Sequence, residues 1–295
     1  MVEPPRRLRR DVFRRRAIAL GLLLAGIGGA LAAAIGATGG GGGATTTTAA
    51  QPKILHIVFP EGFTRAQMAD RIGAVDEIAK ATRGVTPALT PAAYESATAS
   101  SDLPGQFAGD GKPRLLEGFL FPAEYDFFSN ETAAHFVARQ LTAFNQRWAK
   151  VNLGYARSKN LTRYDVLIIA SMIEKEVLVP KERRLVAAVI YNRLHAHMPL
   201  GIDATIRYAL DVPPTRALTA ADLRNPTPYN TRRFQGLPPA PISNPGLPSI
   251  QAAAHPANVD YLYFVRKPDK RHHFFTNSFA AFQAYAAAHG FTPTP

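Results

Sequence analysis

The distribution of hydrophobic and charged positions separates a short N-terminal part from a longer remainder. Residues 17–37 (AIALGLLLAGIGGALAAAIGA) carry no charge. At about 1.5 Å per helical residue this segment extends roughly 30 Å, the thickness of the hydrocarbon core of a bilayer. Residues 1–16 precede it with seven arginines, and positive flanks of this kind stay in the cytoplasm. The pattern predicts a single-pass inner-membrane protein with a cytoplasmic N-terminus and a periplasmic remainder.

A cleaved signal peptide is the alternative interpretation of this apolar segment. Alanine-rich stretches such as residues 30–34 are similar to the small-residue sites at which signal peptides are cut. The length of the apolar run and its flanks favour an uncleaved anchor. Both interpretations export the rest of the chain, and they differ only in whether it stays attached to the membrane.

Beyond the apolar segment, the pattern changes to short strand and helix signals. Residues 38–52 are rich in glycine, threonine and alanine, so we expect a flexible linker. Residues 53–59 (KILHIVF) alternate as a strand does, and a Pro-Glu-Gly turn follows. Thr64 is a candidate N-cap of a helix, and Thr90 or Pro91 opens a second, short one.

The remaining signals are mostly helical, with one pair of strands near the C-terminus. Residues 132–150 have a helical hydrophobic period, and residues 211–248 form a proline-rich loop. Residues 261–266 and 272–276 are expected to be the two strands of a hairpin, and a final helix starts near Ser278. Helices combined with an antiparallel hairpin, without alternating β-α-β units, predict an α+β fold.

The helix that begins at Thr162 is the most hydrophobic element outside the N-terminal segment. Asp165 completes a capping box with Thr162, and residues 166–173 (VLIIASMI) are almost wholly apolar. We therefore expect this helix to be buried on most sides. It should end near Val179, because Pro180 cannot continue it and can instead open the next helix.

Composition and charge narrow the function classes. The chain has 295 residues, 46% of them hydrophobic, no cysteine and a net charge of +12. The absence of cysteine excludes disulfides and thiolate metal sites. The N-terminal arginines account for part of the charge, and the rest is spread without a basic block or a nucleic-acid-binding motif. We therefore expect no nucleic-acid partner, and no ligand spacing predicts a metal.

Glu174 follows the buried apolar run directly. Its neighbours three and four positions away are small or apolar: Ala170, Ser171, Val177 and Leu178. A carboxyl group in such surroundings tends to keep its proton, as a general acid near neutral pH must. An ordinary exposed glutamate at a helix end is the alternative. Glu176 lies on another side of the helix, so no second carboxylate on this helix completes a standard glycosidase pair.

The segment IIASMIEKE (168–176) around Glu174 is one of several long motifs. The others are FPEGFTRAQMA (59–69), LEGFLFPAEYDF (116–127), ERRLVAAVIYNRL (182–194), PLGIDATIRYAL (199–210), PYNT (228–231), GLPPAPISNPGLPSIQAAAHP (236–256), YLYFV (261–265) and HHFFTN (272–277). Taken in chain order, these segments resemble the MltG (YceG-like) endolytic murein transglycosylase family over most of the chain after the linker.

The resemblance implies a reaction and a set of site residues. Such enzymes cleave the β-1,4 bond between N-acetylmuramic acid and N-acetylglucosamine without water, and no cofactor is expected. Glu174 would protonate the glycosidic oxygen and then accept the proton of the C6 hydroxyl, which closes a 1,6-anhydro ring. The resemblance also implies a substrate-binding role, with a purely structural role as the alternative, for Asn192, Asp203, Thr205, Tyr229, Asn230, Glu117 and Tyr125.

The residue pattern and the resemblance together predict a domain organisation, and the resemblance implies partners. The expected parts are a cytoplasmic segment (1–16), a transmembrane helix (17–37), a linker (38–52), a truncated LysM-like subdomain (53–128) and a catalytic domain (129–295). Peptidoglycan glycan strands are the expected substrate, and peptidoglycan synthases are expected partners by analogy. Among the departures from the family pattern, Ala204 stands where the family usually has proline, Ala281 and Phe282 stand where a His-Asn pair is common, and the LysM-like region is shortened. A non-catalytic wall-binding scaffold and a water-using muramidase remain the alternatives.

Overall fold

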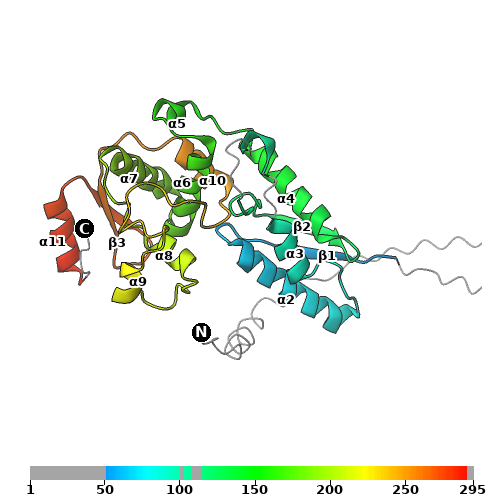
Figure 1. The fold of residues 1–295 in the computed structure, drawn as a ribbon. Helices are drawn as coiled ribbons and strands as arrows, with labels where there is room; N and C mark the ends of the chain where they lie inside the picture. Colours follow the sequence, from blue (N-terminus) through cyan, green and yellow to red (C-terminus); the bar gives the residue numbers. More distant parts are fainter. Residues whose placement is uncertain (1–50, 100–102, 108–113, 291–295) are drawn as a thin grey trace, which may run out of the picture. The chain divides into compact units, whose positions relative to one another are not determined.

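The structure is a computed structural model that describes residues 51–99, 103–107 and 114–290 (Figure 1). Residues 50–295 group into one compact unit, separate from residues 1–49. The predicted cytoplasmic segment, the predicted transmembrane helix and almost all of the predicted linker lie outside the described residues. Within the described ranges, no helix combines the length and the apolar character needed to cross a bilayer.

The described elements mix helices with two small antiparallel sheets, and helices predominate. In chain order they are β1 (Ile54–Val58), α2 (Arg65–Arg83), α3 (Pro91–Thr98), η2 (Gly105–Phe107), β2 (Glu124–Phe128), α4 (Ala133–Trp148), α5 (Gly154–Ser158), α6 (Arg163–Glu176), η3 (Pro180–Glu182), α7 (Arg183–His195), α8 (Asp203–Ala209), α9 (Ala220–Arg224), α10 (Leu247–Ala254), β3 (Tyr263–Arg266), β4 (His273–Thr276) and α11 (Phe279–Ala288). This confirms the mixed, mainly helical fold class.

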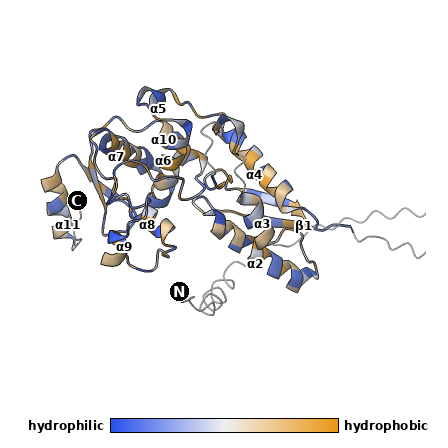
Figure 2. Cartoon of the chain, viewed as in Figure 1, coloured by the Kyte–Doolittle hydropathy of each residue, from blue (hydrophilic) through white to orange (hydrophobic). Residues whose placement is uncertain are grey.

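The first sheet joins two strands that are far apart in the sequence. β1 pairs antiparallel with β2, with Ile54 opposite Phe128. Both strands alternate exposed and buried positions, so one face of the sheet points into a hydrophobic cluster. This N-terminal cluster includes Ile57, Tyr125 and Phe136, which come from β1, β2 and α4. In Figure 2, α2 and α4 carry both hydrophobic and hydrophilic stretches, as helices with one buried side do.

The second hydrophobic cluster surrounds α6. Residues 166–173 of this helix are all buried, as predicted, and α6 packs against α7, α8 and α10. Thr162 and Asp165 form the predicted capping box at its N-terminus. Because residues 166–173 are packed on all sides, the axis of the helix is held firmly in place up to the turn that carries Glu174.

Several sequence expectations are confirmed and three need correction. Thr64, Thr90 and Ser278 cap helices as predicted, and β3 pairs with β4 as the predicted hairpin. The proline-rich stretch 211–248 is not wholly loop, because a capping box at Thr219 starts the short helix α9 and Leu247 already belongs to α10. No sequence signal predicted that β2 is a strand or that it pairs with β1.

The third correction concerns the end of the buried helix. α6 ends at Glu176, and Val177 is already extended, with φ −101° and ψ 121°. Val179 is extended as well, as the residue before a proline prefers, and Pro180 opens the short helix η3 before α7. The chain therefore leaves the helical path directly after the turn that carries Glu174.

Candidate active site

The Glu174 carboxyl group lies almost fully shielded at the end of α6. Its side chain is 6% exposed. One carboxylate oxygen, Oε2, accepts a hydrogen bond from the Gly246 N–H at 3.0 Å. The other, Oε1, lies 3.9 Å from Nη2 of Arg183, the first residue of α7. A buried carboxylate with one backbone donor and one cation is a built site rather than the polar edge of a surface helix.

The surroundings of Glu174 differ from the wholly apolar set that the helical spacing predicted. Because the helix ends at Glu176, positions 177 and 178 no longer stack beside Glu174, and the Leu178 side chain is 61% exposed. The groups that take their place come from elsewhere in the chain: Gly246 from the loop before α10, and Arg183 from α7. The carboxyl group is thus shielded as expected, but by polar partners that the local sequence did not indicate.

The loop that supplies Gly246 is held in place by buried side chains. The Ser171 hydroxyl of α6 accepts the Ile242 N–H at 3.0 Å, and the Ser243 hydroxyl donates to the Ser171 carbonyl at 3.1 Å. Arg183 is fixed in turn, because its Nε donates to the buried Ser249 hydroxyl at 3.1 Å. Both partners of Glu174 therefore approach it from positions fixed by hydrogen bonds, which favours a preorganised centre.

Asn244, in the same loop, connects the two hydrophobic clusters. Its Oδ1 accepts the N–H groups of Gly118 and Leu120 at 2.8 and 3.0 Å. Its Nδ2 donates to the Phe63 carbonyl at 3.0 Å and to Oε1 of Glu117 at 2.9 Å. The side chain is completely buried. The motif ISNPG was visible in the sequence, but nothing local indicated that its asparagine binds segments more than a hundred residues away.

Glu117 is a predicted site residue that the structure places inside the protein. It is 4% exposed and accepts hydrogen bonds from the Arg65 N–H at 3.1 and 3.2 Å and from the Tyr208 hydroxyl at 3.3 Å. Burial raises the pKa of the Glu117 carboxyl to about 7. The ring of Tyr229 packs against that of Tyr208, with the two centroids 5.3 Å apart. Glu117, Tyr208 and Tyr229 are therefore brought together, next to Asn244.

Thr205 and Asn230 are also predicted site residues, and both are fully buried. The Thr205 hydroxyl donates to the Ile202 carbonyl at 2.8 Å. The Asn230 Nδ2 group donates to the carbonyls of Leu223 and Asn225 at 2.9 and 2.8 Å. These hydrogen bonds fit the structural role that the sequence left open, and contact with a glycan stays a prediction for both residues.

The other predicted site residues lie in three different places. Asp203 is partly exposed and forms an ion pair with Arg232 at 2.6 Å. Asn192, on α7, donates two hydrogen bonds of 2.9 Å to carbonyls in the segment before β3. Tyr125 is a core residue of the N-terminal cluster, and its hydroxyl donates to the Phe121 carbonyl at 2.8 Å. A substrate-binding role stays a prediction for each of them.

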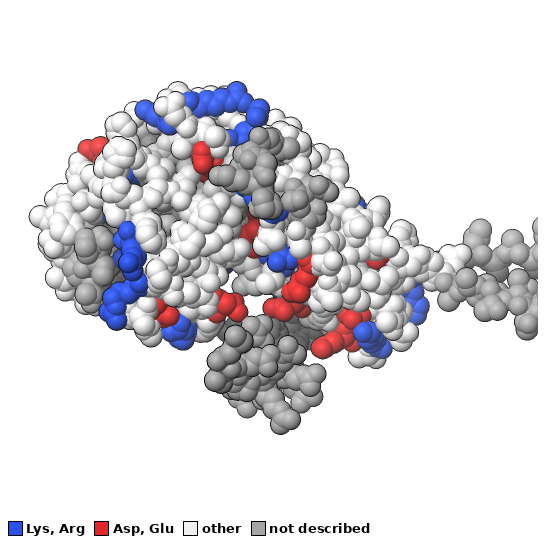
Figure 3. All heavy atoms as spheres, viewed as in Figure 1, with Lys and Arg blue, Asp and Glu red and all other residues white. Residues whose placement is uncertain are grey.

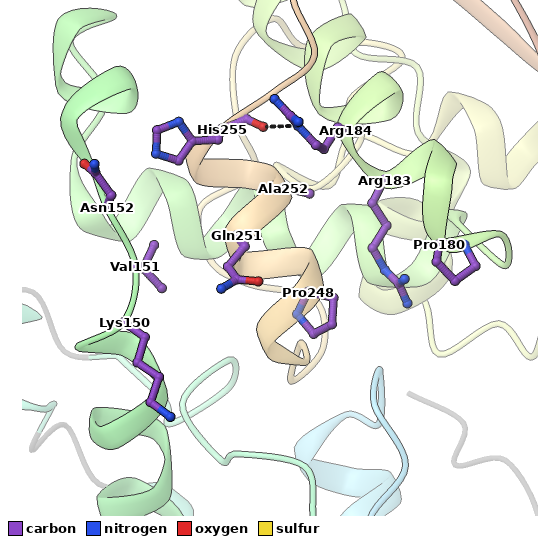
Figure 4. A pocket seen from close by; sticks show the side chains of 10 residues that line it. All are labelled: Lys150, Val151, Asn152, Pro180, Arg183, Arg184, Pro248, Gln251, Ala252 and His255. Carbon is purple, nitrogen blue, oxygen red and sulfur yellow. Dashed lines mark hydrogen bonds between the residues drawn. The ribbon is translucent and has the colours of Figure 1, made fainter.

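A hollow of about 550 Å³ adjoins the Glu174 centre through Arg183 (Figure 4). It is lined by Lys150, Val151, Asn152, Pro180, Arg183, Arg184, Pro248, Gln251, Ala252 and His255. Glu174 does not line this hollow. In Figure 4, Arg183 extends between Pro180 and Pro248, and Arg184 is occupied by its hydrogen bond to the His255 carbonyl at 2.9 Å.

The charges on the visible face are not arranged as one basic surface. Figure 3 shows acidic side chains gathered near the middle of this face, with lysines and arginines mostly toward its margins. Among the described residues, no group of three or more histidine, aspartate or glutamate side chains is arranged to hold a metal ion. A shielded carboxyl group of this kind is suited to proton transfer.

Comparison with known proteins gives consistent results. The model of the YceG-like family matches residues 43–288. The chain is similar to an endolytic murein transglycosylase of Bacillus subtilis (37% identity over 152 residues, 52% of this chain and 42% of that protein) and to one of Streptococcus pneumoniae strain R6 (31% over 230 residues, 73% and 41%). It thus spans about two fifths of the length of these relatives.

The fold is similar to that of a solved structure. The crystal structure of a YceG-like protein from Listeria monocytogenes superposes with a TM-score of 0.66 at 29% sequence identity. The match covers 78% of this chain and 75% of the other. The sequence segments that predicted the resemblance therefore belong to a shared fold as well as to a shared family.

Proposed function

The chain belongs to the YceG-like family, and we propose that it is a peptidoglycan lytic endotransglycosylase with Glu174 as its acid–base residue. The observation that carries this proposal is the shielded Glu174 carboxyl group, held between the Gly246 N–H and the Arg183 guanidinium. The names of the relatives, endolytic murein transglycosylases, support the substrate class. The substrate would be the bond between N-acetylmuramic acid and N-acetylglucosamine.

The proposed reaction needs one proton donated and one proton accepted. Glu174 donates its proton to the glycosidic oxygen as the bond from C1 to that oxygen breaks. The C6 hydroxyl of the same muramic acid residue attacks C1, and its proton returns to the carboxylate, so a 1,6-anhydro end forms without water. After the first transfer Glu174 is negatively charged, and the Gly246 N–H and Arg183 then stabilise it.

The proposal includes a location and partners. Residues 17–37 would anchor the protein in the inner membrane, with the N-terminus in the cytoplasm and residues 53–295 in the periplasm. An enzyme held there would cut nascent glycan strands close to the membrane at which they are made. Peptidoglycan synthases are the proposed partners by family analogy alone.

The decisive experiment is digestion of purified cell-wall sacculi by the full-length protein and by its Glu174→Gln variant. We expect the wild type to release fragments with 1,6-anhydro ends, and the variant to be slower by about 10²-fold or more, because a side-chain amide cannot donate this proton. Mass spectrometry of the products tests the muramidase alternative, whose reducing ends are heavier by one water molecule. A wild type that binds sacculi without cutting them would support the scaffold alternative.

A further inference from the structure

The turn between β1 and α2 is fixed directly against the Glu174 centre. The Gly62 N–H donates to the Asn244 carbonyl at 2.9 Å, and the Asn244 N–H donates to the Phe63 carbonyl at 2.9 Å. Lys175 Nζ, from the last turn of α6, donates to the Gly62 carbonyl at 3.1 Å. Gly62 has φ +80°, a conformation that favours glycine. The residue before it, Glu61, is therefore placed by a backbone that cannot easily shift.

The Glu61 carboxyl group occupies the space beside Gly246. A Cβ atom built on Gly246 would lie 1.8 Å from Oε1 of Glu61 and 2.1 Å from its Cδ. Gly246 has φ −75° and ψ 165°, which any residue can adopt, so the glycine is needed here for room and not for its backbone conformation. The N–H of this same glycine binds Glu174. Two carboxyl groups thus meet at one residue.

The charges around Glu61 couple it to Glu174. Burial raises the pKa of the Glu61 carboxyl, the negative charge of Glu174 raises it further, and Arg183 opposes both effects. The charged groups that face this position are Glu174 and Lys175 from α6 and Arg183 from α7. Two carboxyl groups therefore lie near one guanidinium, and the charge of Glu174 favours the protonated form of Glu61.

Glu61 is exposed enough for a substrate to reach it. The residue as a whole is exposed, although its carboxyl group packs against Gly246, whereas the Glu174 side chain is shielded. In the described part of the chain the Glu61 carboxylate accepts no hydrogen bond, so it is not needed to hold the turn, which is secured by the backbone bonds of Gly62 and Phe63. A glutamate whose backbone is fixed beside the centre and whose carboxylate accepts no hydrogen bond from the described residues is available for chemistry.

We propose that Glu61 is a second catalytic carboxyl group that contacts the sugar and shares the transferred proton with Glu174. This inference rests on the proposed function. As the C1–oxygen bond breaks, the proton of the pair passes to the leaving oxygen. The C6 hydroxyl oxygen forms the new bond to C1, and its proton passes to the pair. The pair ends with the single proton with which it began, and no further reactant is consumed.

The experiment measures release of anhydro-ended fragments across a range of pH by full-length wild type, Glu61→Gln and Gly246→Ala. We expect Glu61→Gln to lower the rate by about 10²-fold while its melting temperature stays close to that of the wild type. The pH profile of any remaining activity should also change, because Glu61, whose pKa is raised at this position, no longer titrates. Glu77→Gln, an exposed glutamate on α2, changes the net charge equally and should leave the rate unchanged.

Gly246→Ala tests the same carboxyl group without removing it. The new methyl group should displace the Glu61 side chain and slow the reaction, and the double variant with Glu61→Gln should be no slower than Glu61→Gln alone. Additive losses in the double variant would overturn the inference, as would a folded Glu61→Gln protein with wild-type rate and pH profile. If Glu61→Gln does not fold, Gly246→Ala at wild-type rate overturns it instead.

The two proposals fail in different ways. If wild type releases no anhydro-ended fragments, the proposed function fails and this inference falls with it. If wild type is active, Glu174→Gln is inactive and Glu61→Gln is as active as wild type, only the inference about Glu61 fails.

Discussion

Replacing Asn244 by alanine should weaken the connection between the two hydrophobic clusters and lower the free energy of unfolding. This side chain makes four buried hydrogen bonds, two to the N–H groups of Gly118 and Leu120 and two to oxygens of Phe63 and Glu117. The two acceptors keep other donors, because the Phe63 carbonyl still receives the backbone N–H of residue 244 and Glu117 still receives that of Arg65. The N–H groups of Gly118 and Leu120, by contrast, have no other acceptor among the described residues.

The size of the effect follows from those two N–H groups. A buried donor that loses its partner costs about 1–3 kcal/mol, so two of them cost about 2–6 kcal/mol, with smaller losses at the two oxygens. We therefore expect Asn244→Ala to lower the free energy of unfolding by about 4 kcal/mol. Asn152→Ala is the matched control, because Asn152 is exposed and binds one N–H, that of Gly154 at 2.8 Å. Its cost should stay within about 1 kcal/mol.

Urea unfolding of the full-length protein in detergent, followed by tryptophan fluorescence, measures both changes. The single tryptophan, Trp148, is buried at the end of α4 and reports loss of packing there. Activity on sacculi below the unfolding transition should also fall, because Gly62 and Gly246 are both fixed through the Asn244 loop. If Asn244→Ala costs no more than Asn152→Ala, the hydrogen bonds of this side chain do not join the clusters, and the reasoning is wrong.

Two further predictions concern stability. Burial raises the pKa of Glu117 from 4.5 to about 7, so the folded protein keeps a proton that the unfolded chain releases. The contribution of Glu117 to stability should therefore be greatest below about pH 4.5 and fall by about 3 kcal/mol toward pH 7. Glu117→Gln should remove this fall in unfolding titrations at a series of pH values, and an unchanged slope would contradict the assignment. Gly118→Ala should lower the free energy of unfolding by about 3 kcal/mol, because Gly118 has φ +91° and an added Cβ would lie 2.7 Å from Pro241. Gly84→Ala is the control: Gly84 has φ +60° but no neighbour within 4 Å, so its loss should be about 1 kcal/mol. Equal melting temperatures for the two variants would refute this reasoning.

The sequence by itself determined the elements whose causes are local. The capping box of Thr162 and Asp165 starts α6 and its apolar run buries it, whereas its end at Glu176, three residues before the predicted one, was not determined locally. The hairpin of β3 and β4 was predictable for the same reason, because its strands are joined by a short turn. The position of Glu174 at the end of a buried helix followed from these local patterns.

Only the tertiary structure decided what surrounds that carboxyl group. Glu61 and Arg183 reach the site from other elements, and Gly246 and Asn244 come from a loop about seventy residues after Glu174. The pairing of β1 with β2 is equally distant in sequence. A local pattern records the hydrogen bonds and burial of its own few residues, but which remote backbone N–H or cation completes a site depends on how whole elements pack.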